Sequence, residues 1–133
     1  MKSMSITKAA MVILILFSAN LLAKSDPAEK RCVDQIQSAL KSENEGVVES
    51  AIFISLSLKN YFPETNIGKI VNKINDLVTD GSTPVIKYKA QLASLYFTYP
   101  ALFSDIKISS KGNPDAYFKM ISERLVNTSL ASN

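Results

Sequence analysis

The sequence predicts an all-α fold, built as a short stack of helical hairpins. Two segments 39 residues apart carry the same pattern of apolar residues at helical spacing: Val47, Ala51, Ile54 and Leu58, then Ile86, Ala90, Ala93 and Phe97. A polar stretch with helix-starting residues precedes each copy. Self-similarity at a period of about 20 to 50 residues is typical of stacked repeats, in which each unit buries its apolar face against a neighbour.

The first 23 residues have the layout of a secretory signal peptide. Lys2 and Lys8 form a basic start, residues 9–17 are an unbroken apolar run, and the predicted cleavage point follows Ala23. The alternative is a retained membrane anchor, but only 15 residues separate Lys8 from the next lysine, whereas a spanning helix needs about 20 apolar residues. We therefore expect an exported protein, periplasmic or secreted, with no stable membrane span after the leader is removed.

Removal of the leader, residues 1–23, leaves a nearly neutral chain, residues 24–133, which is long enough for one compact helical domain. The full chain has 15 basic and 12 acidic residues, and two of the lysines lie in the leader. The excess of basic over acidic residues in the full chain therefore belongs largely to the targeting signal. No basic run interleaved with aromatic residues remains, so nucleic acid is not an expected partner.

Capping residues, prolines and glycine divide this domain into five helices. Helix starts are predicted at Asp26-Pro27, at Ser42 with Glu45, at Thr65 or Asn66, at Thr83-Pro84 and at Asn113-Pro114. Helix ends are predicted before Pro63, at Asp80-Gly81 and before Pro100. The expected helices cover about 27–40, 47–61, 67–78, 84–99 and 113–130.

Two stretches fit this division less directly. Residues 54–58 alternate between apolar and polar, as a half-buried strand does, but no hairpin turn or partner strand is visible nearby, and we interpret them as helix. Residues 106–108 alternate more briefly. They lie in the segment 101–112, which is expected to be an irregular connection with at most one helical turn.

The helices pair into two hairpin units, residues 33–61 and 66–99. Their second helices open with Gly46-Val47-Val48-Glu49-Ser50-Ala51 and Pro84-Val85-Ile86-Lys87-Tyr88-Lys89-Ala90. This pattern resembles that of HEAT-like helical repeats. In that family a loop is followed by an aliphatic residue, then by a position that is often Arg, then by two variable positions and a small residue. Val48 and Lys87 stand where Arg is usual. The resemblance implies a short right-handed stack, with helix 113–130 as a cap at one end.

Helical-repeat proteins often bind partners through the surface of their second helices. In the first unit, eight of the twelve residues from 47 to 58 are apolar, so this copy of the pattern is expected to be core. The second copy carries a polar stripe, and the candidate protein-contact patch is Lys87, Tyr88, Gln91, Ser94 and Tyr99. The alternative interpretation is the solvated side of an ordinary amphipathic helix. The expected function is protein–protein interaction in the cell envelope, with a partner of unknown identity.

Catalysis has little support in this sequence. There is no histidine, which removes the commonest general base and metal ligand, and no catalytic, cofactor or metal site is expected. Two carboxylate pairs at i, i+4 spacing, Glu45/Glu49 and Asp76/Asp80, are the basis of a less favoured hypothesis of a carboxylate-dependent enzyme.

Two further alternatives concern apolar residues. The aromatic and aliphatic excess suggests a carrier of an apolar ligand or lipid, although core packing explains the same residues, which include Phe53, Phe62, Tyr96, Phe97 and Phe103. Cys32, the single cysteine, follows Lys30 and Arg31, whose charges could favour the thiolate. It is either a free thiol or a link between subunits, or else a small apolar side chain on a buried stripe. We favour the buried stripe because free cysteine is among the most buried residue types.

Overall fold

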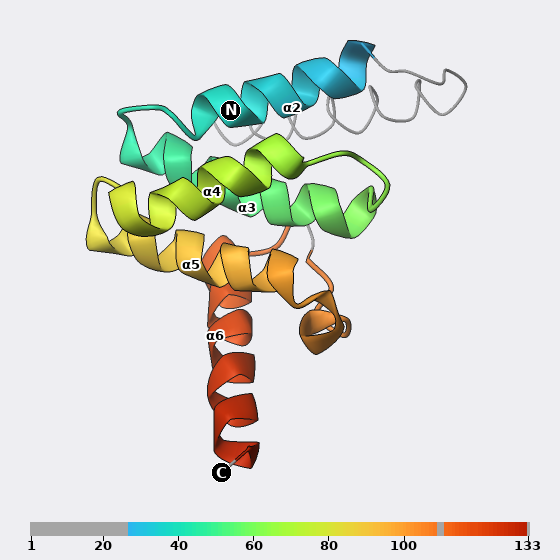
Figure 1. Ribbon diagram of the computed structural model, residues 1–133, viewed down its shortest axis with the longest axis vertical. Coiled ribbons are helices and arrows are strands. Elements are labelled where there is room, and N and C mark those ends of the chain that lie inside the picture. The colour runs from blue at the N-terminus through green and yellow to red at the C-terminus, as the bar shows by residue number, and fades with distance from the viewer. Residues whose placement is uncertain (1–26, 109–110, 133) are drawn as a thin grey trace.

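The computed structural model describes residues 27–108 and 111–132, and the predicted signal peptide lies outside them. This part of the chain contains no strand, and its elements are α2 (Pro27–Ala39), α3 (Glu45–Tyr61), α4 (Gly68–Asp80), α5 (Pro84–Thr98), the 3-10 helix η1 (Pro100–Phe103) and α6 (Pro114–Ala131). The prediction of an all-α fold is therefore confirmed (Figure 1).

Two antiparallel hairpins form the body of the protein. Helices α2 and α3 make the first hairpin, and α4 and α5 make the second (Figure 1). The hairpins stack so that α2 packs on α4 while α3 packs on α5, which places the first helices in one layer and the second helices in the other. Helix α6 contacts α5 and η1 and runs steeply across the direction of α5 (Figure 1).

Local capping explains most of the helix starts. The Thr83 hydroxyl accepts a hydrogen bond from the backbone N–H of Ile86 at 3.2 Å, at the start of α5. The Asn113 side chain does the same for Asp115 at 3.0 Å, at the start of α6. Each interaction pairs an N–H that the first turn of a helix leaves without a partner. These two starts agree with the sequence prediction.

The start of α3 differs from the prediction. The helix begins at Glu45, two residues before the expected position, so Asn44 becomes the N-cap and accepts a hydrogen bond from the N–H of Val47 at 3.2 Å. Ser42, the predicted cap, instead accepts from the N–H of Asn44 at 3.0 Å. Asn is as good an N-cap as Ser, and here it lies closer to the first helical turn.

The alternating segment 54–58 is helical, as interpreted. Its two serines are buried, and the Ser55 hydroxyl donates to the carbonyl of Ala51 at 2.7 Å, one turn back. This bond lets a polar side chain occupy a buried helical position without a free donor. The alternation therefore reflects a helix buried on most of its sides.

In its described residues, 99–108 and 111–113, the connection between α5 and α6 is mostly irregular, as expected, and contains the 3-10 helix η1. Beyond η1, Ile106 and Ile108 are buried while Lys107 between them is exposed. The Asn60 side-chain amide donates to the carbonyl of Ile108 at 3.1 Å, which ties this segment to the end of α3. The strand-like alternation thus marks an extended segment that packs on helices.

The core lies between the two layers, and small residues allow the helices to approach one another closely there. Ala51 and Ala90, the small residues expected to allow close approach of the helices, are 2% and 0% exposed. Gly81 ends α4, and a Cβ atom at this position would lie 2.7 Å from the Leu77 carbonyl oxygen. The tight turn into α5 therefore requires glycine because a larger residue would collide with backbone.

The expectation that the first copy of the repeated pattern is core is wrong at two of its four positions. Val47 is 41% exposed and Ile54 is 36% exposed, whereas Ala51 and Leu58 are buried. In the second copy, the matching Ile86 and Ala93 are buried because α5 packs on both α3 and α4. Among the described residues, α3 has no preceding unit to cover the same face.

Candidate functional site

The predicted contact patch lies on the outer face of α5. Lys87 and Gln91 are exposed one turn apart, and Tyr88 and Tyr99 are each about half exposed. On the inner side of the same helix, by contrast, Tyr96 is buried, and this burial raises its pKa. The side chains of Lys87, Gln91 and the two tyrosines therefore remain in contact with solvent.

The edges of this patch are tied to neighbouring helices. The Ser94 hydroxyl donates to the side-chain oxygen of Asn75 on α4 at 2.6 Å, and Ser94 is only partly exposed. On the other edge, the Tyr88 hydroxyl donates to the Ser122 hydroxyl on α6 at 2.9 Å. Ser94 thus serves helix packing, while the tyrosine bond orients an exposed ring.

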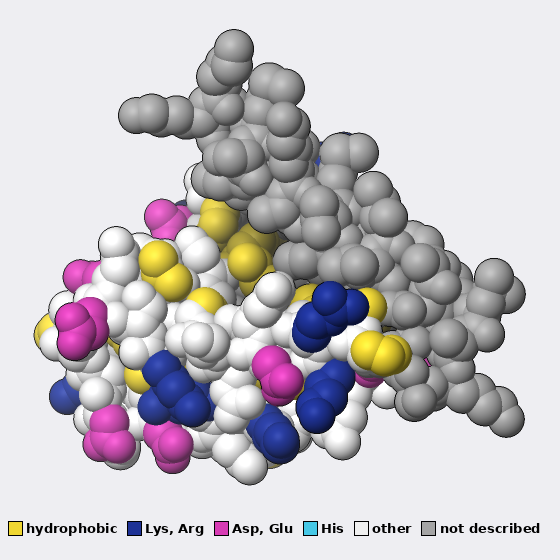
Figure 2. Space-filling view, turned by 90° about the horizontal axis from the view of Figure 1, so that it is seen from above, with side chains coloured by type: hydrophobic (Ala, Val, Ile, Leu, Met, Phe, Trp, Pro, Cys, Tyr) yellow, Lys and Arg dark blue, Asp and Glu magenta, His cyan; other side chains and the backbone are white. Residues whose placement is uncertain are grey.

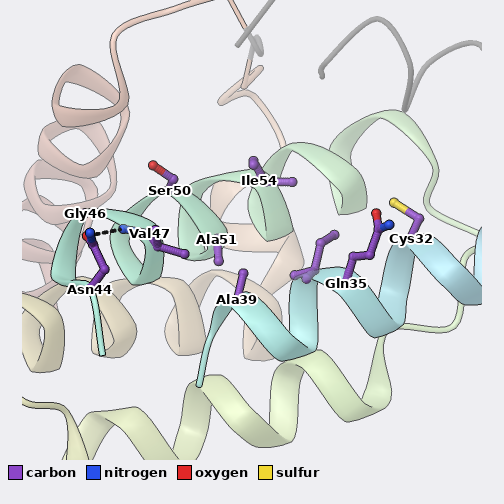
Figure 3. A pocket seen from close by; sticks show the side chains of 10 residues that line it. Cys32, Gln35, Ala39, Asn44, Gly46, Val47, Ser50, Ala51 and Ile54 are labelled. Atoms are coloured by element: carbon purple, nitrogen blue, oxygen red, sulfur yellow. Dashed lines mark hydrogen bonds between the residues drawn. The ribbon is translucent and has the colours of Figure 1, made fainter. Parts of the chain in front are cut away.

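A groove between α2 and α3 is a second surface, which the sequence did not predict (Figure 3). It has a volume of about 450 Å³ and is open to solvent. None of its lining residues is charged: Cys32, Gln35, Ile36, Ala39, Asn44, Gly46, Val47, Ser50, Ala51 and Ile54. Val47 and Ile54, whose exposure overturned the core prediction, form its α3 wall together with Ser50 (Figure 3).

One signal in the sequence points to this groove. Helix α3 has more apolar residues than one interface needs. The repeat pattern places Val47 and Ile54 at the positions of Ile86 and Ala93, which are buried in the second copy. The first unit of a stack has no preceding unit to cover these positions. An apolar residue at one of them is therefore a candidate for exposure.

A charged cluster around Lys89 joins three helices. The Lys89 ammonium on α5 lies 2.5 Å from a Glu49 carboxylate oxygen on α3 and 3.0 Å from an Asp115 oxygen in the first turn of α6. It also lies 5.4 Å from the ring centre of Phe118, at cation–π distance. Burial lowers the pKa of Lys89, but hydrogen bonds to the two carboxylates outweigh this effect and leave the pKa raised.

The first predicted carboxylate pair has structural partners. Glu49 pairs with Lys89, and a Glu45 oxygen accepts a hydrogen bond from the Thr83 hydroxyl at 2.9 Å. Both contacts link the start of α3 to α5. Asp76 and Asp80 are exposed at the end of α4. Over residues 27–108 and 111–132, no group of three or more His, Cys, Asp or Glu side chains is placed to hold a metal ion.

Cys32 is a buried free thiol that lines the groove. Desolvation by burial, followed by the negative charge of Glu29, raises its pKa. A raised pKa leaves less thiolate at neutral pH, and the thiolate is the reactive form. The interpretation of Cys32 as a buried apolar side chain agrees with this environment, and the alternative of activation by the neighbouring basic residues does not.

The aromatic residues behind the carrier hypothesis pack mainly on one another and on the core. The rings of Tyr96 and Phe103 have centres 5.5 Å apart, and those of Phe53 and Tyr117 are 5.9 Å apart. Phe62 and Phe97 are partly buried against the same core. None of the five predicted aromatics lines the α2/α3 groove.

Charges of both signs are interspersed on the face seen in Figure 2, and neither sign forms a continuous field there. No helix within the described ranges combines the length and the apolar character that crossing a bilayer requires. No protein-family model matches the chain, and neither a curated protein nor a solved structure matches it.

Proposed function

We propose that this chain is an exported, non-catalytic helical-repeat protein that binds a protein partner in the cell envelope through the exposed face of α5. The observation that carries the proposal is the pair of half-exposed tyrosines, Tyr88 and Tyr99, beside the exposed Lys87 and Gln91. Tyrosine is enriched at protein interfaces because its large ring is apolar, while its hydroxyl forms hydrogen bonds with water or with a polar group of the partner.

The surroundings of α5 support this use of its outer face. The helix packs on α3, α4 and α6, and the Tyr88 and Ser94 hydroxyls are held by Ser122 and Asn75. A surface fixed on three sides loses little conformational freedom when a partner binds, so more of the contact energy appears as affinity. The stacking of hairpin on hairpin is the architecture that HEAT-like repeats use for such surfaces.

Site-specific crosslinking in the native cell tests the proposal. A photoreactive residue at Gln91, on the α5 face, is compared with one at Asn72, an exposed position on α4. We expect one envelope protein to be captured at position 91 and not at position 72. Capture of the same proteins at both positions, or of none at position 91, would contradict the proposal.

Tyrosine variants give a matched control. Tyr88→Ala and Tyr99→Ala should each reduce the crosslink at position 91 by about tenfold or more, which is the loss expected when an interface anchor worth roughly 1.4 kcal/mol or more is truncated. Tyr61→Ala should leave the crosslink unchanged. Tyr61 is also about half exposed and also lies at the end of a second helix, but on α3. Equal effects of all three variants would show that the α5 face is not the binding surface.

A carrier of an apolar ligand is the second candidate function, and the α2/α3 groove favours it. The groove volume of about 450 Å³ lies within the usual range for ligand sites, and its lining is uncharged. Native mass spectrometry of mildly purified protein would detect a bound lipid. The carrier function requires that Val47→Asp, which places a charge in the groove wall, removes that lipid.

A further inference from the structure

Two uncharged surfaces without a partner lie at different ends of the described chain. One is the α2/α3 groove, which exposes Val47 and Ile54. The other is the last two turns of α6, here called the α6 tip and defined as residues 126–132, all of which are exposed. We propose that the α6 tip of one copy of this protein inserts into the α2/α3 groove of a second copy.

The α6 tip has the chemistry of a groove-binding helix. Val126 is 54% exposed and Leu130 is 68% exposed, and their i, i+4 spacing places them on the same side of the helix. Residues 125–132 include no charged side chain. The tip extends away from the two hairpins (Figure 1). It therefore presents two apolar anchors with no charged side chain among its residues.

The groove has matching properties. Its lining carries no charge, so an uncharged segment can enter without leaving a buried ion unpaired. Val47 and Ile54 lie about two helical turns apart, or roughly 10 Å, which suits the length of a two-turn helix end. In the second hairpin, the corresponding face of α5 packs on α3 of the first hairpin. The chain itself thus shows that this kind of face receives a helix.

The tip cannot turn back to the groove of its own chain. The first turn of α6 is held by the contacts of Lys89 with Asp115 and Phe118. The middle of the helix is held by Arg124, which donates two hydrogen bonds of 2.6 Å to the two carboxylate oxygens of Asp105 and a third of 2.6 Å to the Leu102 carbonyl. Beyond Arg124 the helix continues away from the two hairpins (Figure 1), so the α2/α3 groove that it can enter is that of a second copy.

This contact joins two different surfaces, so a pair of copies would still carry one free groove, on one copy, and one free tip, on the other. Such a head-to-tail contact produces open chains or, where the rotation closes, rings. The apolar area of the anchors and the groove rim is on the order of a few hundred Å², below the roughly 1,200 Å² of stable interfaces. The association is therefore weak and depends on concentration. It does not use the α5 face of the proposed function.

Two charge substitutions and their mixture test the proposal. Val47→Asp blocks the groove and leaves the tip intact, while Leu130→Asp blocks the tip and leaves the groove intact. Protein purified after expression of the full chain is studied by analytical ultracentrifugation at about 10 to 500 µM. We expect the wild-type chain to shift to dimers and larger species as concentration rises, and each variant alone to remain monomeric. An equimolar mixture of the two variants should form a heterodimer and nothing larger.

Val85→Asp is the matched control because Val85 is also a half-exposed valine in the first turn of a second helix, but it lies on α5 outside both surfaces. It should associate as the wild type does, and far-UV circular dichroism should show the same helix content for all variants. A monomeric wild type over the whole range overturns the proposal. So does a mixture that stays monomeric, or a Leu130→Asp variant that still dimerises, which would indicate contact between two grooves.

Discussion

Substitution of Lys89 by methionine is the most direct test of how α6 is attached to the hairpins. Methionine keeps much of the apolar stem of lysine and removes the ammonium, which contacts Glu49, Asp115 and the Phe118 ring. The Lys89 side chain is 14% exposed, while the carboxylate side chains of Glu49 and Asp115 are 29% and 77% exposed. The pair with Glu49 is therefore the stronger of the two.

The size of the effect follows from these exposures. A partly buried, charge-assisted hydrogen bond contributes about 1.5–3 kcal/mol, and an exposed ion pair such as that with Asp115 contributes about 0–1 kcal/mol. We expect Lys89→Met to lower the free energy of unfolding by about 2–3 kcal/mol and Tm by roughly 8–15 °C. Lys119→Met is the control because Lys119 makes only an exposed i, i+4 pair with Glu123 at 3.7 Å, worth about 0.5 kcal/mol or less.

Urea unfolding followed by circular dichroism measures both variants, together with Glu49→Gln and the double variant Lys89→Met/Glu49→Gln. We expect a coupling energy between positions 89 and 49 of about 1 kcal/mol or more. A loss for Lys89→Met no larger than that for Lys119→Met, or a coupling energy near zero, would refute the reasoning. Either result would mean that desolvation of the ammonium cancels its attraction to Glu49.

The pH dependence of this effect has a definite sign. The pKa of Lys89 is raised in the folded state, so its contribution to stability is complete below the pKa of an unfolded lysine, about 10.4. The contribution is lost as pH rises through the folded pKa. The stability difference between the wild type and Lys89→Met should therefore be constant from about pH 7 to 9 and shrink above about pH 10.4.

Three further predictions concern packing, the thiol and the connection before α6. Ala90→Leu should lower the free energy of unfolding by about 1–3 kcal/mol because Ala90 is fully buried between helices. Gln91→Leu, on the exposed face, should change it by no more than about 0.5 kcal/mol. Thermal unfolding measures both variants, and equal stabilities would show that the protein around Ala90 can expand. Cys32 should react with a maleimide at least about tenfold more slowly in native protein than in urea, since burial raises its pKa; equal rates would contradict the buried position. Hydrogen bonds from Arg124 lower the pKa of Asp105, so the stabilising effect of this pair is present above the unfolded pKa of about 3.9 and is lost as pH falls through the folded pKa. Arg124→Gln should therefore destabilise the protein more at pH 7 than in acid, where only the bond to the Leu102 carbonyl remains to be lost. An NMR titration of Asp105 that is the same in both proteins would argue against the pairing.

The features that were predicted correctly depend on short-range signals. Thr83-Pro84 and Asn113-Pro114 combine a capping side chain with a proline suited to the first turn, and both start helices as expected. At the start of α3 two capping residues compete within three positions, and Asn44 rather than Ser42 is used. The prediction was wrong there because capping strength is similar for the two residues, so the choice depends on where the helix packs.

The candidate site was predicted only in part, because its edges are made by residues far apart in the chain. The exposure of Lys87 and Gln91 follows from their position on the polar side of an amphipathic helix. The engagement of Ser94 with Asn75, and of Tyr88 with Ser122, depends on how α4 and α6 approach α5. A helical periodicity indicates which side of a helix is polar and not which neighbour meets it.

The sequence alone determined that this chain is helical, where most of its helices begin and end, and which small residues lie where helices approach closely. Helical periodicity, caps and prolines act within a few residues, so they can be read without the fold. Only the tertiary structure decided that Val47 and Ile54 are exposed and that Lys89 joins three helices. Burial depends on which elements cover a face, and that is a property of the assembled hairpins and of no single segment.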